Sequence, residues 1–271
     1  MSSSADWTLV TVTYNSAATL RRCWTAANIG DARWIVVDNA STDGSVDVAR
    51  SLGADVVTRT RNDGFSVANN AGLAVVETPW VMFVNPDVTV GTPADLDRLA
   101  ATAARHGSLV APRLIHPDGT DQRNGRGLPL PTHKIRHRGV RLPWVDPDDY
   151  ARADLDVPTY VAWAIGAAIG GPTTLLRSLR GWDERYFVYY EDHDLGLRSW
   201  ASGHPVILDP VVSWVHEWQR ETARLRWAPW RHELRSARRF YATYPGLRSA
   251  RRAAHDGSLR NLSRHLWSEA G

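Results

Sequence analysis

Three carboxylates crowd into four consecutive positions of the segment VYYEDHDLGLRSW, residues 188–200. They are Glu191, Asp192 and Asp194, and His193 lies among them. Neighbouring carboxylates repel one another, and the aromatic approach RGWDERYFVYYED could form a pocket in which the pKa of one acid rises toward the range of a general base. A structural role is the alternative, because acids in the first turn of a helix are stabilised by the helix dipole.

A second candidate for chemistry is Asp87, which ends an apolar run as FVNPD. Mg²⁺ and Mn²⁺ prefer one or two carboxylates together with substrate phosphate oxygens, and a single acid at the end of a strand suits that arrangement. His216, in the segment SWVHEW, could add an imidazole ligand. The alternatives are a simple turn for the Asn-Pro-Asp triplet and a structural role for a histidine beside tryptophan.

Asp38 ends another apolar run and begins the turn DNASTDG. A carboxylate in this place could accept hydrogen bonds from a nucleobase N–H or from ribose hydroxyls. It could equally serve the turn, since Asp and Asn side chains readily bond to the backbone that follows them. We assign Asn39, Ser41 and Asp43 to the turn itself.

These acids must be positioned by the alternating strands and helices of the first hundred residues. Alternation of this kind predicts βαβ units and a mostly parallel sheet, whose ligands bind beyond the carboxyl ends of the strands. Strands are expected at 9–13, 34–37, 54–58, 80–84 and 108–111, with helices from about 17, 46, 65 and 93. The polar segments that follow the strands are Tyr14-Asn15, Asp38-Asn39, Asn62-Asp63-Gly64 and Asn85-Pro86-Asp87. No glycine-rich phosphate loop of the GxGxxG or GxxxxGK[ST] type occurs, so a nucleotide would be held in another way.

The second half of the chain is less regular. Residues 115–158 lack periodicity, which is typical of a functional or partly disordered stretch. Beyond it we expect a buried segment at 160–169, a helix at 191–202 and short strands at 206–208 and 211–215. The tail is predicted to be helical up to Pro245-Gly246. Its expected apolar stripe consists of Trp230, Leu234, Ala237, Tyr241 and Tyr244.

Composition limits the class of protein. The apolar fraction of 43% is that of a globular protein, and the single cysteine, Cys23, excludes a disulfide framework within the chain. The N-terminus lacks the pattern of a signal peptide, and the longest near-apolar run, 160–171, is too short to span a bilayer. We therefore expect a cytoplasmic protein, with a peripheral position at the inner face of the membrane as one option.

The formal charge of +3 is unevenly distributed. Residues 218–271 hold 12 Arg and four acids, a balance of +8, which leaves −5 for residues 1–217. Such a tail could meet phosphates, anionic lipid or nucleic acid, or it could be an ordinary solvated helical face. We expect two domains, a catalytic domain at 1–217 and a basic, Trp-containing helical extension at 218–271.

With these residues assembled, the chain resembles an inverting family 2 glycosyltransferase of the GT-A fold, and most nearly the rhamnosyltransferase-like members. The resemblance covers residues 8 to 216 and rests on six pieces in the family's order. They are VTVTYNSAATL, VVDNASTDGS, NDGFSVANNAGL, VMFVNPD, GWDERYFVYYEDHDLGLR and VVSWVH. The resemblance implies an α/β fold with a Rossmann-like, mostly parallel central sheet flanked by helices, followed here by the C-terminal helical extension.

The resemblance also implies a reaction, the transfer of a sugar from a nucleotide diphosphate donor to an acceptor hydroxyl with inversion. L-Rhamnose from dTDP-rhamnose is favoured by the family likeness, with UDP- and GDP-linked sugars as alternatives. The acceptor is a glycan, a lipid-linked glycan or a natural product. By the family pattern, the residues around the nucleotide and the donor sugar are Tyr14, Asn15, Asp38, Asn62, Gly64, Phe65, Asn69, Asn85 and Asp87.

The same pattern assigns the remaining roles. Asp87 binds the Mg²⁺ or Mn²⁺ that bridges the diphosphate, and His216 falls where many members place a further metal ligand. Asp192 matches the general base that takes the acceptor proton. Trp182 and Glu191 match the acceptor side of the site.

Three departures from the family pattern bear on these roles. Asn85-Pro86-Asp87 stands in place of Asp-x-Asp, which implies a metal site with one carboxylate and weaker metal dependence. Residues 180–184 read RGWDE where the family usually has GGFDE, which changes the shape of the acceptor pocket. His193 replaces the apolar residue often found between the two acids.

Two rival functions follow from the residues. A sugar-nucleotide pyrophosphorylase shares a similar sheet but requires a glycine-rich basic loop, which VTYNSAATL lacks. A non-catalytic protein that binds membranes or nucleic acid through the Arg/Trp tail would not need Asp87 or Asp192. For a glycosyltransferase we expect no nucleic-acid partner, and we expect the tail to dock on the catalytic domain or on a second subunit in a homodimer. Its Arg face could then contact an anionic membrane.

Overall fold

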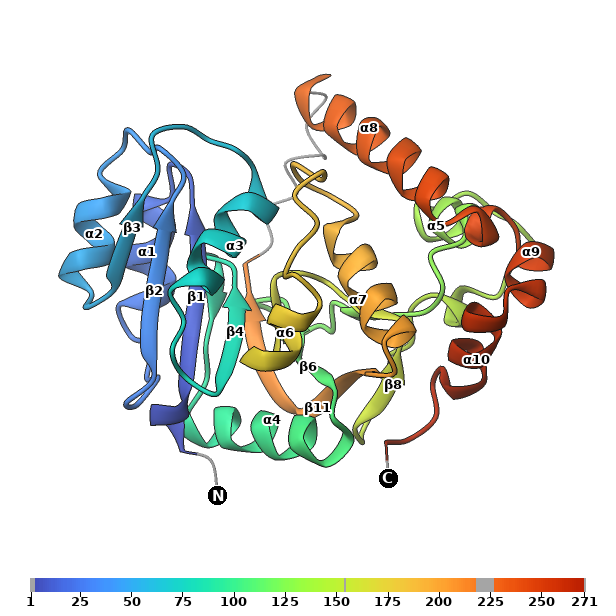
Figure 1. Cartoon of the computed structure of the whole chain (residues 1–271), viewed down its shortest axis with the longest axis horizontal. Coiled ribbons are helices and arrows are strands. Elements are labelled where there is room, and N and C mark those ends of the chain that lie inside the picture. The colour runs from blue at the N-terminus through green and yellow to red at the C-terminus, as the bar shows by residue number, and fades with distance from the viewer. Residues whose placement is uncertain (1–2, 154, 218–226, 271) are drawn as a thin grey trace.

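The computed structural model describes residues 3–153, 155–217 and 227–270. Its first part is the expected succession of strands and helices, shown in blue to green in Figure 1. The strands are β1 (Trp7–Thr13), β2 (Arg33–Asp38), β3 (Asp55–Thr58), β4 (Trp80–Val84), β5 (Val88–Thr89) and β6 (Leu109–Ile115). The helices are α1 (Ala17–Trp24), α2 (Ser45–Ser51), α3 (Phe65–Ala74) and α4 (Pro93–His106).

The second part adds shorter elements and completes the sheet. Its strands are β7 (Gly125–Arg126), β8 (Thr159–Val161), β9 (Trp163–Ala164), β10 (Ala168–Pro172) and β11 (Val206–His216). Its helices are α5 (Pro131–His137), α6 (Thr173–Ser178), α7 (Glu191–Ala201), α8 (Trp227–Thr243), α9 (Ala250–His255) and α10 (Gly257–His265). Short 3₁₀ turns occur at Ser4–Asp6, Pro147–Asp149 and Pro245–Arg248.

The central sheet has the order β3-β2-β1-β4-β10-β6-β11-β5, with β8 also paired to β11. The first four strands are parallel, as the βαβ pattern predicts. Beyond β4 the sheet becomes mixed, because β10 runs antiparallel to both β4 and β6 while β11 runs parallel to β6. Topology therefore brings the ends of the four parallel strands to one edge and inserts the later half of the chain beside them.

Two hydrophobic cores lie on opposite faces of this sheet. Alternation along β1 sends Leu9 to the core beneath α1, α2 and α4 and sends Val10 to the core beneath α3 and α6. The second core also holds Trp182 and Leu195 of α7. Consequently α7, which begins at the cluster of acids, is anchored to the face of the sheet that α3 covers.

Two expectations for the later elements are wrong. The two strands expected at 206–208 and 211–215 form one strand, β11, whose register shifts between Asp209 and Ser213. Pro210 cannot donate to the ladder, and Val211 is exposed there, so the strand bulges without ending. On α8, Leu234 is 67% exposed and does not belong to the packed face, while Phe240 is fully buried. The face turned toward the protein runs through Ala237, Phe240, Tyr241 and Tyr244, and the side chain of Trp230 lies outside the described residues.

The C-terminal helices pack against the rest of the chain on the side of the molecule away from α1 and α2 (Figure 1). A third core joins residues of α8 and α10 to aromatic residues around α7, and its buried members include Phe240, Leu262, Trp163 and Tyr190. The chain end then pairs with β8, since Trp267 N–H donates to Tyr160 O (2.9 Å) and Tyr160 N–H to Ser268 O (3.0 Å). The apolar face of the tail is thus covered within the chain itself. Among the described residues, no helix has the length and apolar character needed to cross a bilayer.

Candidate active site

The carboxyl ends of the parallel strands form one side of the candidate site. Thr13 is the register partner of Asp38, and Asp38 is the partner of Thr58 on the next strand. The polar segments that follow these strands therefore emerge side by side, as the sequence predicts. β4 ends one position before Asn85, so the Asn-Pro-Asp triplet emerges at the same edge.

The segment after β1 and the segment after β2 are tied to each other. The buried Asp38 carboxylate accepts hydrogen bonds from Thr13 Oγ1 (3.2 Å) and from the backbone N–H of Ser41 (3.0 Å). Asn15 Oδ1 accepts from Thr42 N–H (2.8 Å), and Asn15 N–H donates to Ser41 Oγ (2.8 Å). Asp38 thus holds the turn, which is one of the two roles that its sequence context left open. Contact with a nucleobase or ribose stays a prediction.

The segment after β3 contacts the loop before α7. Asn62 Oδ1 accepts from Asn39 Nδ2 (3.0 Å), and Phe65 N–H donates to Phe187 O (2.7 Å). Gly64 has φ +95°, and a Cβ at this position would come within 2.5 Å of Phe187 O, so only glycine fits. This close approach links the donor side of the expected site to the loop that carries the acids.

Two other residues expected near the donor differ in their surroundings. Asn69 is buried on α3, where its Nδ2 donates to Phe65 O (3.0 Å), so it braces the start of that helix. Tyr14 is 53% exposed and is the most accessible aromatic ring at this edge among the residues expected to border the nucleotide. Its position suits stacking against a flat base.

Asp87 and His216 are brought together by the pairing of β5 with β11. Asp87 Oδ1 lies 3.4 Å from His216 Nε2, and Glu217 N–H donates to Asp87 O (2.9 Å). The other side of the ring is held by Gln122, whose Oε1 is 2.7 Å from His216 Nδ1 and whose Nε2 donates to His216 O (2.7 Å). Because Gln122 Oε1 only accepts, Nδ1 carries the proton of the neutral ring, and in that form the Nε2 lone pair is directed to the Asp87 side.

This arrangement fits a divalent cation. A carboxylate oxygen and an imidazole nitrogen, with the second ring nitrogen oriented by an amide, form a set of donors that Mg²⁺ or Mn²⁺ can use. Within the described ranges, no group of three or more His, Cys, Asp or Glu side chains is placed to hold a metal. The remaining ligands would come from substrate phosphate and water, as is usual for Mg²⁺.

Residues 165–167 connect this corner to the acids of α7. Asn85 N–H donates to Ala167 O (2.8 Å), and the preceding residue, Gly166, donates its N–H to Asp192 Oδ2 (3.3 Å). Gly166 also packs under the Trp182 ring, since a Cβ there would lie 3.3 Å from it. One short loop therefore contacts Asn85, Trp182 and Asp192.

Asp192 is the terminus of a chain of three polar side chains. Its Oδ1 lies 2.5 Å from His193 Nδ1 and also accepts from the backbone N–H of His193 (2.8 Å). His193 Nε2 lies 3.2 Å from Lys134 Nζ. Lys134 Nζ sits over the Tyr190 ring, 3.6 Å from its centroid, while the His193 ring stacks on Trp163 at 3.5 Å. The two aromatic rings fix the direction of the chain Lys134–His193–Asp192.

The pKa values of this chain assign its protons. Burial, with the nearby Lys134 charge, lowers the pKa of His193 to about 4, so the ring is neutral at neutral pH. Burial also lowers the pKa of Lys134 to about 8, partly offset by the attraction of Asp192. Lys134 therefore donates to His193 Nε2, and His193 Nδ1–H donates to Asp192. Burial by itself would raise the pKa of Asp192, but the electrostatic attraction of His193, its hydrogen bonds and the charge of Lys134 outweigh burial and lower that pKa. Asp192 is a carboxylate that can accept a proton.

The other two acids of the cluster are in different environments. Glu191 is buried, and burial together with the neighbouring Asp192 raises its pKa well above the ordinary value. Its Oε2 has no hydrogen-bond partner among the described residues. Asp194 accepts from Arg198 Nε (2.6 Å) and from Tyr244 OH (2.8 Å), and thereby fastens α7 to the C-terminal helices. Of the three acids, Asp192 is therefore ionised and burial favours the neutral form of Glu191. Asp194 forms a structural ion pair with Arg198.

Two residues of the site escaped the sequence analysis. Lys134 and Gln122 both come from the aperiodic stretch 115–158 and reach partners 59 and 94 residues away. The composition could have indicated Lys134, because it is the chain's single lysine beside 31 arginines (32 basic residues less one). Gln122 has no such mark, and its role depends on a contact that only the fold creates.

Comparison with known proteins places this geometry in a family context. The family model described as "Glycosyl transferase family 2" matches residues 8–152. Among curated proteins, an N-acetylglucosaminyl-diphospho-decaprenol L-rhamnosyltransferase of Mycobacterium tuberculosis is 28% identical over 240 residues, which are 80% of this chain and 77% of that protein.

Solved structures with low sequence identity share the fold. The mannosyltransferase PcManGT from Pyrobaculum calidifontis, in complex with GDP-Man and Mn²⁺, matches with a TM-score of 0.61 at 17% identity, over 96% of this chain and 68% of that one. GalNAc-T7 with UDP, GalNAc and Mn²⁺ matches with a TM-score of 0.58 at 14% identity, over 96% of this chain and 54% of that one. These likenesses confirm the GT-A type α/β architecture expected from the sequence.

Proposed function

This chain belongs to glycosyl transferase family 2, and we propose that it transfers a sugar from a nucleotide diphosphate donor to a hydroxyl of a lipid-linked glycan with inversion at the anomeric carbon. L-Rhamnose is the sugar we favour, because the curated relative is a rhamnosyltransferase. The name of that relative also supports the acceptor class, since it describes a sugar joined through a diphosphate to a polyprenol.

In this proposal the edge of the parallel strands binds the donor. Tyr14, Asn15 and Asp38 border the base and ribose, while Asn62, Gly64 and Phe65 line the path toward the sugar. Asp38 and Asn62 are already held by hydrogen bonds, so their side chains need little reorganisation when the donor binds. Rigid placement of this kind lowers the entropy cost of orienting two substrates.

Asp87 and His216 would hold the divalent cation, with Asn85 beside them. When bound, the cation neutralises negative charge that develops on the departing diphosphate. Gln122 keeps the imidazole in the tautomer that presents Nε2, so the protein contributes one negative and one neutral donor. A single carboxylate is consistent with the weaker metal dependence that the Asn-Pro-Asp triplet implies.

Asp192 acts as the general base. The acceptor hydroxyl gives its proton to Asp192 as its oxygen bonds to the anomeric carbon, and the bond from that carbon to the diphosphate oxygen breaks. Direct attack by the acceptor on the face opposite the diphosphate gives inversion. Trp182 and the neutral form of Glu191 border the acceptor, and neither competes with Asp192 for the proton.

The observation that carries this proposal is the loop of residues 165–167. Its hydrogen bonds join the Asn-Pro-Asp triplet to Asp192, so the candidate cation site and the candidate base share one support. If Asp192 only stabilised the start of α7, its carboxylate would need no partner outside that helix. It accepts a hydrogen bond from the backbone N–H of Gly166, which lies outside α7. A common support for both chemical groups is what a two-substrate displacement requires.

The test is a panel of dTDP-, UDP- and GDP-linked sugars, each with and without Mg²⁺ or Mn²⁺. Thermal unfolding reports donor binding, and slow hydrolysis of the donor reports turnover without an acceptor. We expect dTDP-rhamnose with a divalent cation to give the largest stabilisation. Stabilisation by none of the donors would contradict the proposed function, and a preference for UDP- or GDP-sugars would correct only the sugar.

A further inference from the structure

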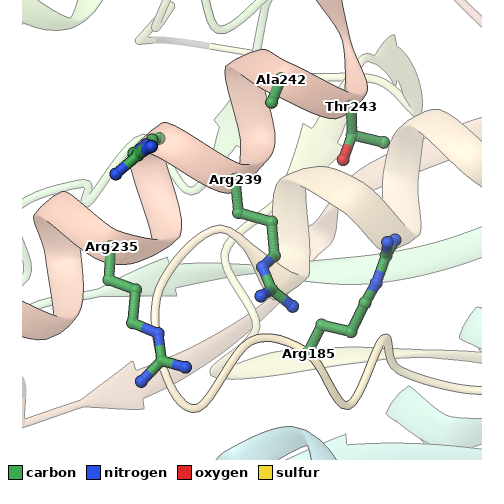
Figure 2. Close-up of a pocket in the computed structure, with 6 residues that line it drawn as sticks. Arg185, Arg235, Arg239, Ala242 and Thr243 are labelled. Carbon is green, nitrogen blue, oxygen red and sulfur yellow. The ribbon is translucent and has the colours of Figure 1, made fainter.

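One face of α8 is lined with arginines and looks onto a cavity of about 560 Å³. Arg235, Arg238, Arg239, Ala242 and Thr243 follow a spacing of three and four residues, which places them on one side of the helix. Arg185, from the loop before α7, closes the opposite wall. In Figure 2, Arg235 and Arg239 project from the helix toward the loop that carries Arg185.

The positive charge of this cavity is not balanced by the described residues around it. Asp183 is the carboxylate that pairs with one of the four guanidinium groups, binding Arg185 at 2.6 Å. Glu233, on the neighbouring turn of α8, pairs with Arg138. Four arginines and one aspartate leave a balance of +3, and like charges at these helical spacings repel one another. Such a cluster is stabilised when an anion with several oxygens binds.

One loop joins the cavity to the acceptor side of the proposed active site. The loop of residues 183–190 runs from Trp182 to Glu191, and so connects the two residues expected to border the acceptor. Phe187 of this loop contacts the donor side through its hydrogen bond from Phe65 N–H. Ser236 Oγ donates to Val188 O (2.9 Å), which fixes α8 against the same loop. The arginines therefore line the same loop that joins Trp182 to Glu191.

We propose that this cavity binds the diphosphate group of the lipid-linked acceptor. The inference rests on the proposed function for the identity of the acceptor, but the anion site is carried by the arginines themselves. Guanidinium groups bind phosphate oxygens through two parallel hydrogen bonds, and they stay charged at all relevant pH values. The diphosphate would anchor the lipid at α8, and the sugar would extend along the loop to Asp192.

The first test measures binding without catalysis. Geranyl diphosphate is titrated calorimetrically into the full chain with EDTA and without donor, so neither a cation nor turnover contributes. The variant R235Q/R239Q removes two of the four guanidinium groups. The matched control is R251Q/R252Q, which removes the same charge from two exposed arginines of α9. We expect at least a tenfold loss of affinity in the first variant, equivalent to about 1.4 kcal/mol, and less than a twofold change in the control.

Three results would overturn the inference: retained affinity in R235Q/R239Q, an equal loss in R251Q/R252Q, or equal binding of geranyl diphosphate and uncharged geraniol. Vesicles of phosphatidylglycerol form a separate arm. If R235Q/R239Q loses binding to these vesicles but keeps its affinity for geranyl diphosphate, the arginines contact the membrane surface and the diphosphate site is wrong.

A second test separates this inference from the proposed function. With a lipid diphosphate acceptor, R235Q/R239Q should raise the acceptor KM at least tenfold and leave donor hydrolysis unchanged. If the wild-type protein transfers no sugar from any donor, the proposed function fails whatever the binding result. If transfer proceeds and the acceptor KM does not change in the variant, only the diphosphate site fails.

Discussion

His193 is the residue through which the pKa of the proposed base is controlled, and the substitution His193→Phe isolates that effect. Phenylalanine retains a flat ring for the stack on Trp163 and removes both ring nitrogens. The Asp192 carboxylate keeps its hydrogen bonds from the backbone N–H of residue 193 and from Gly166. The variant therefore loses the side-chain hydrogen bond at 2.5 Å and leaves the carboxylate otherwise supported.

The direction in which the pKa of Asp192 should change follows from the opposite effects of burial and of His193 on that pKa. In the wild type, the electrostatic attraction and hydrogen bonds of His193, with the charge of Lys134, outweigh burial and lower the pKa of Asp192, and activity should be lost as the pH falls through that pKa. Without the ring hydrogen bond, burial raises the pKa and activity is lost at higher pH. A hydrogen bond to a charged group contributes about 1.5–3 kcal/mol. At about 1.4 kcal/mol for each factor of ten, the proton concentration that halves activity should fall about ten- to a hundredfold. The Asp192 side chain is only 14% exposed, so solvent screens this effect little.

The assay is the pH profile of kcat/KM for transfer, measured below pH 7 for the wild type and for His193→Phe. Donor binding and thermal unfolding of the variant are the controls, and both should stay close to wild type near pH 7. Lys134→Met should move the acidic limb in the same direction by a smaller amount, because Lys134 is one hydrogen bond further from Asp192. An unchanged acidic limb in a folded, donor-binding His193→Phe protein would refute control of the base by His193.

Three further substitutions test neighbouring groups. Asp192→Asn should lower kcat about 10²- to 10⁴-fold and keep the donor affinity, and a rapid-quench transfer assay with normal turnover would exclude Asp192 as the base. Asp87→Ala should abolish the extra thermal stabilisation that Mg²⁺ or Mn²⁺ gives to the donor complex, whereas a full metal response in the variant would place the cation elsewhere. Glu191→Gln should flatten the pH dependence of stability in urea unfolding between pH 5 and 8. The raised pKa of Glu191 means that the folded state holds its proton above the ordinary range near 4.3, so wild-type stability falls as pH rises until the folded-state pKa is passed. A slope that is identical in Glu191→Gln would contradict that burial effect.

The parallel half of the fold could be predicted because its information is local. Each strand from β1 to β4 is a short β-branched or aromatic run followed by a polar turn, and parallel pairing then brings the turns to one edge. Asp38 and Asp87 could be placed there without knowledge of any side-chain contact. The same logic failed at Asp209, because the bulge in β11 depends on the neighbouring strand β6 and not on the residues of β11 alone.

The proposed base and its partners could be predicted only in part. Asp192 was indicated by its place in a cluster of acids, but the cluster does not reveal which acid is ionised. That distinction depends on Lys134, which reaches His193 from a stretch without periodicity. The outward position of Leu234 is a similar case. Helical spacing permits Leu234 or Phe240 to lie in the packed stripe, and the shape of the surface around Tyr190 selects Phe240.

The backbone before α7 shows why the C-terminal helices belong to the catalytic argument. Tyr189 and Tyr190 have φ of +69° and +71°, a left-handed conformation that costs about 1–3 kcal/mol for each non-glycine residue. Two such residues in succession turn the chain sharply into Glu191 and Asp192. The conformation persists because α8 compensates for it: Phe240 packs 5.1 Å from the Tyr190 ring, and Ser236 binds Val188 O. Since Lys134 also rests on Tyr190, the strained turn positions both ends of the chain that controls the base. The basic tail is therefore a structural support of the proposed catalytic carboxylate, and the same helix carries the arginines of the proposed diphosphate site.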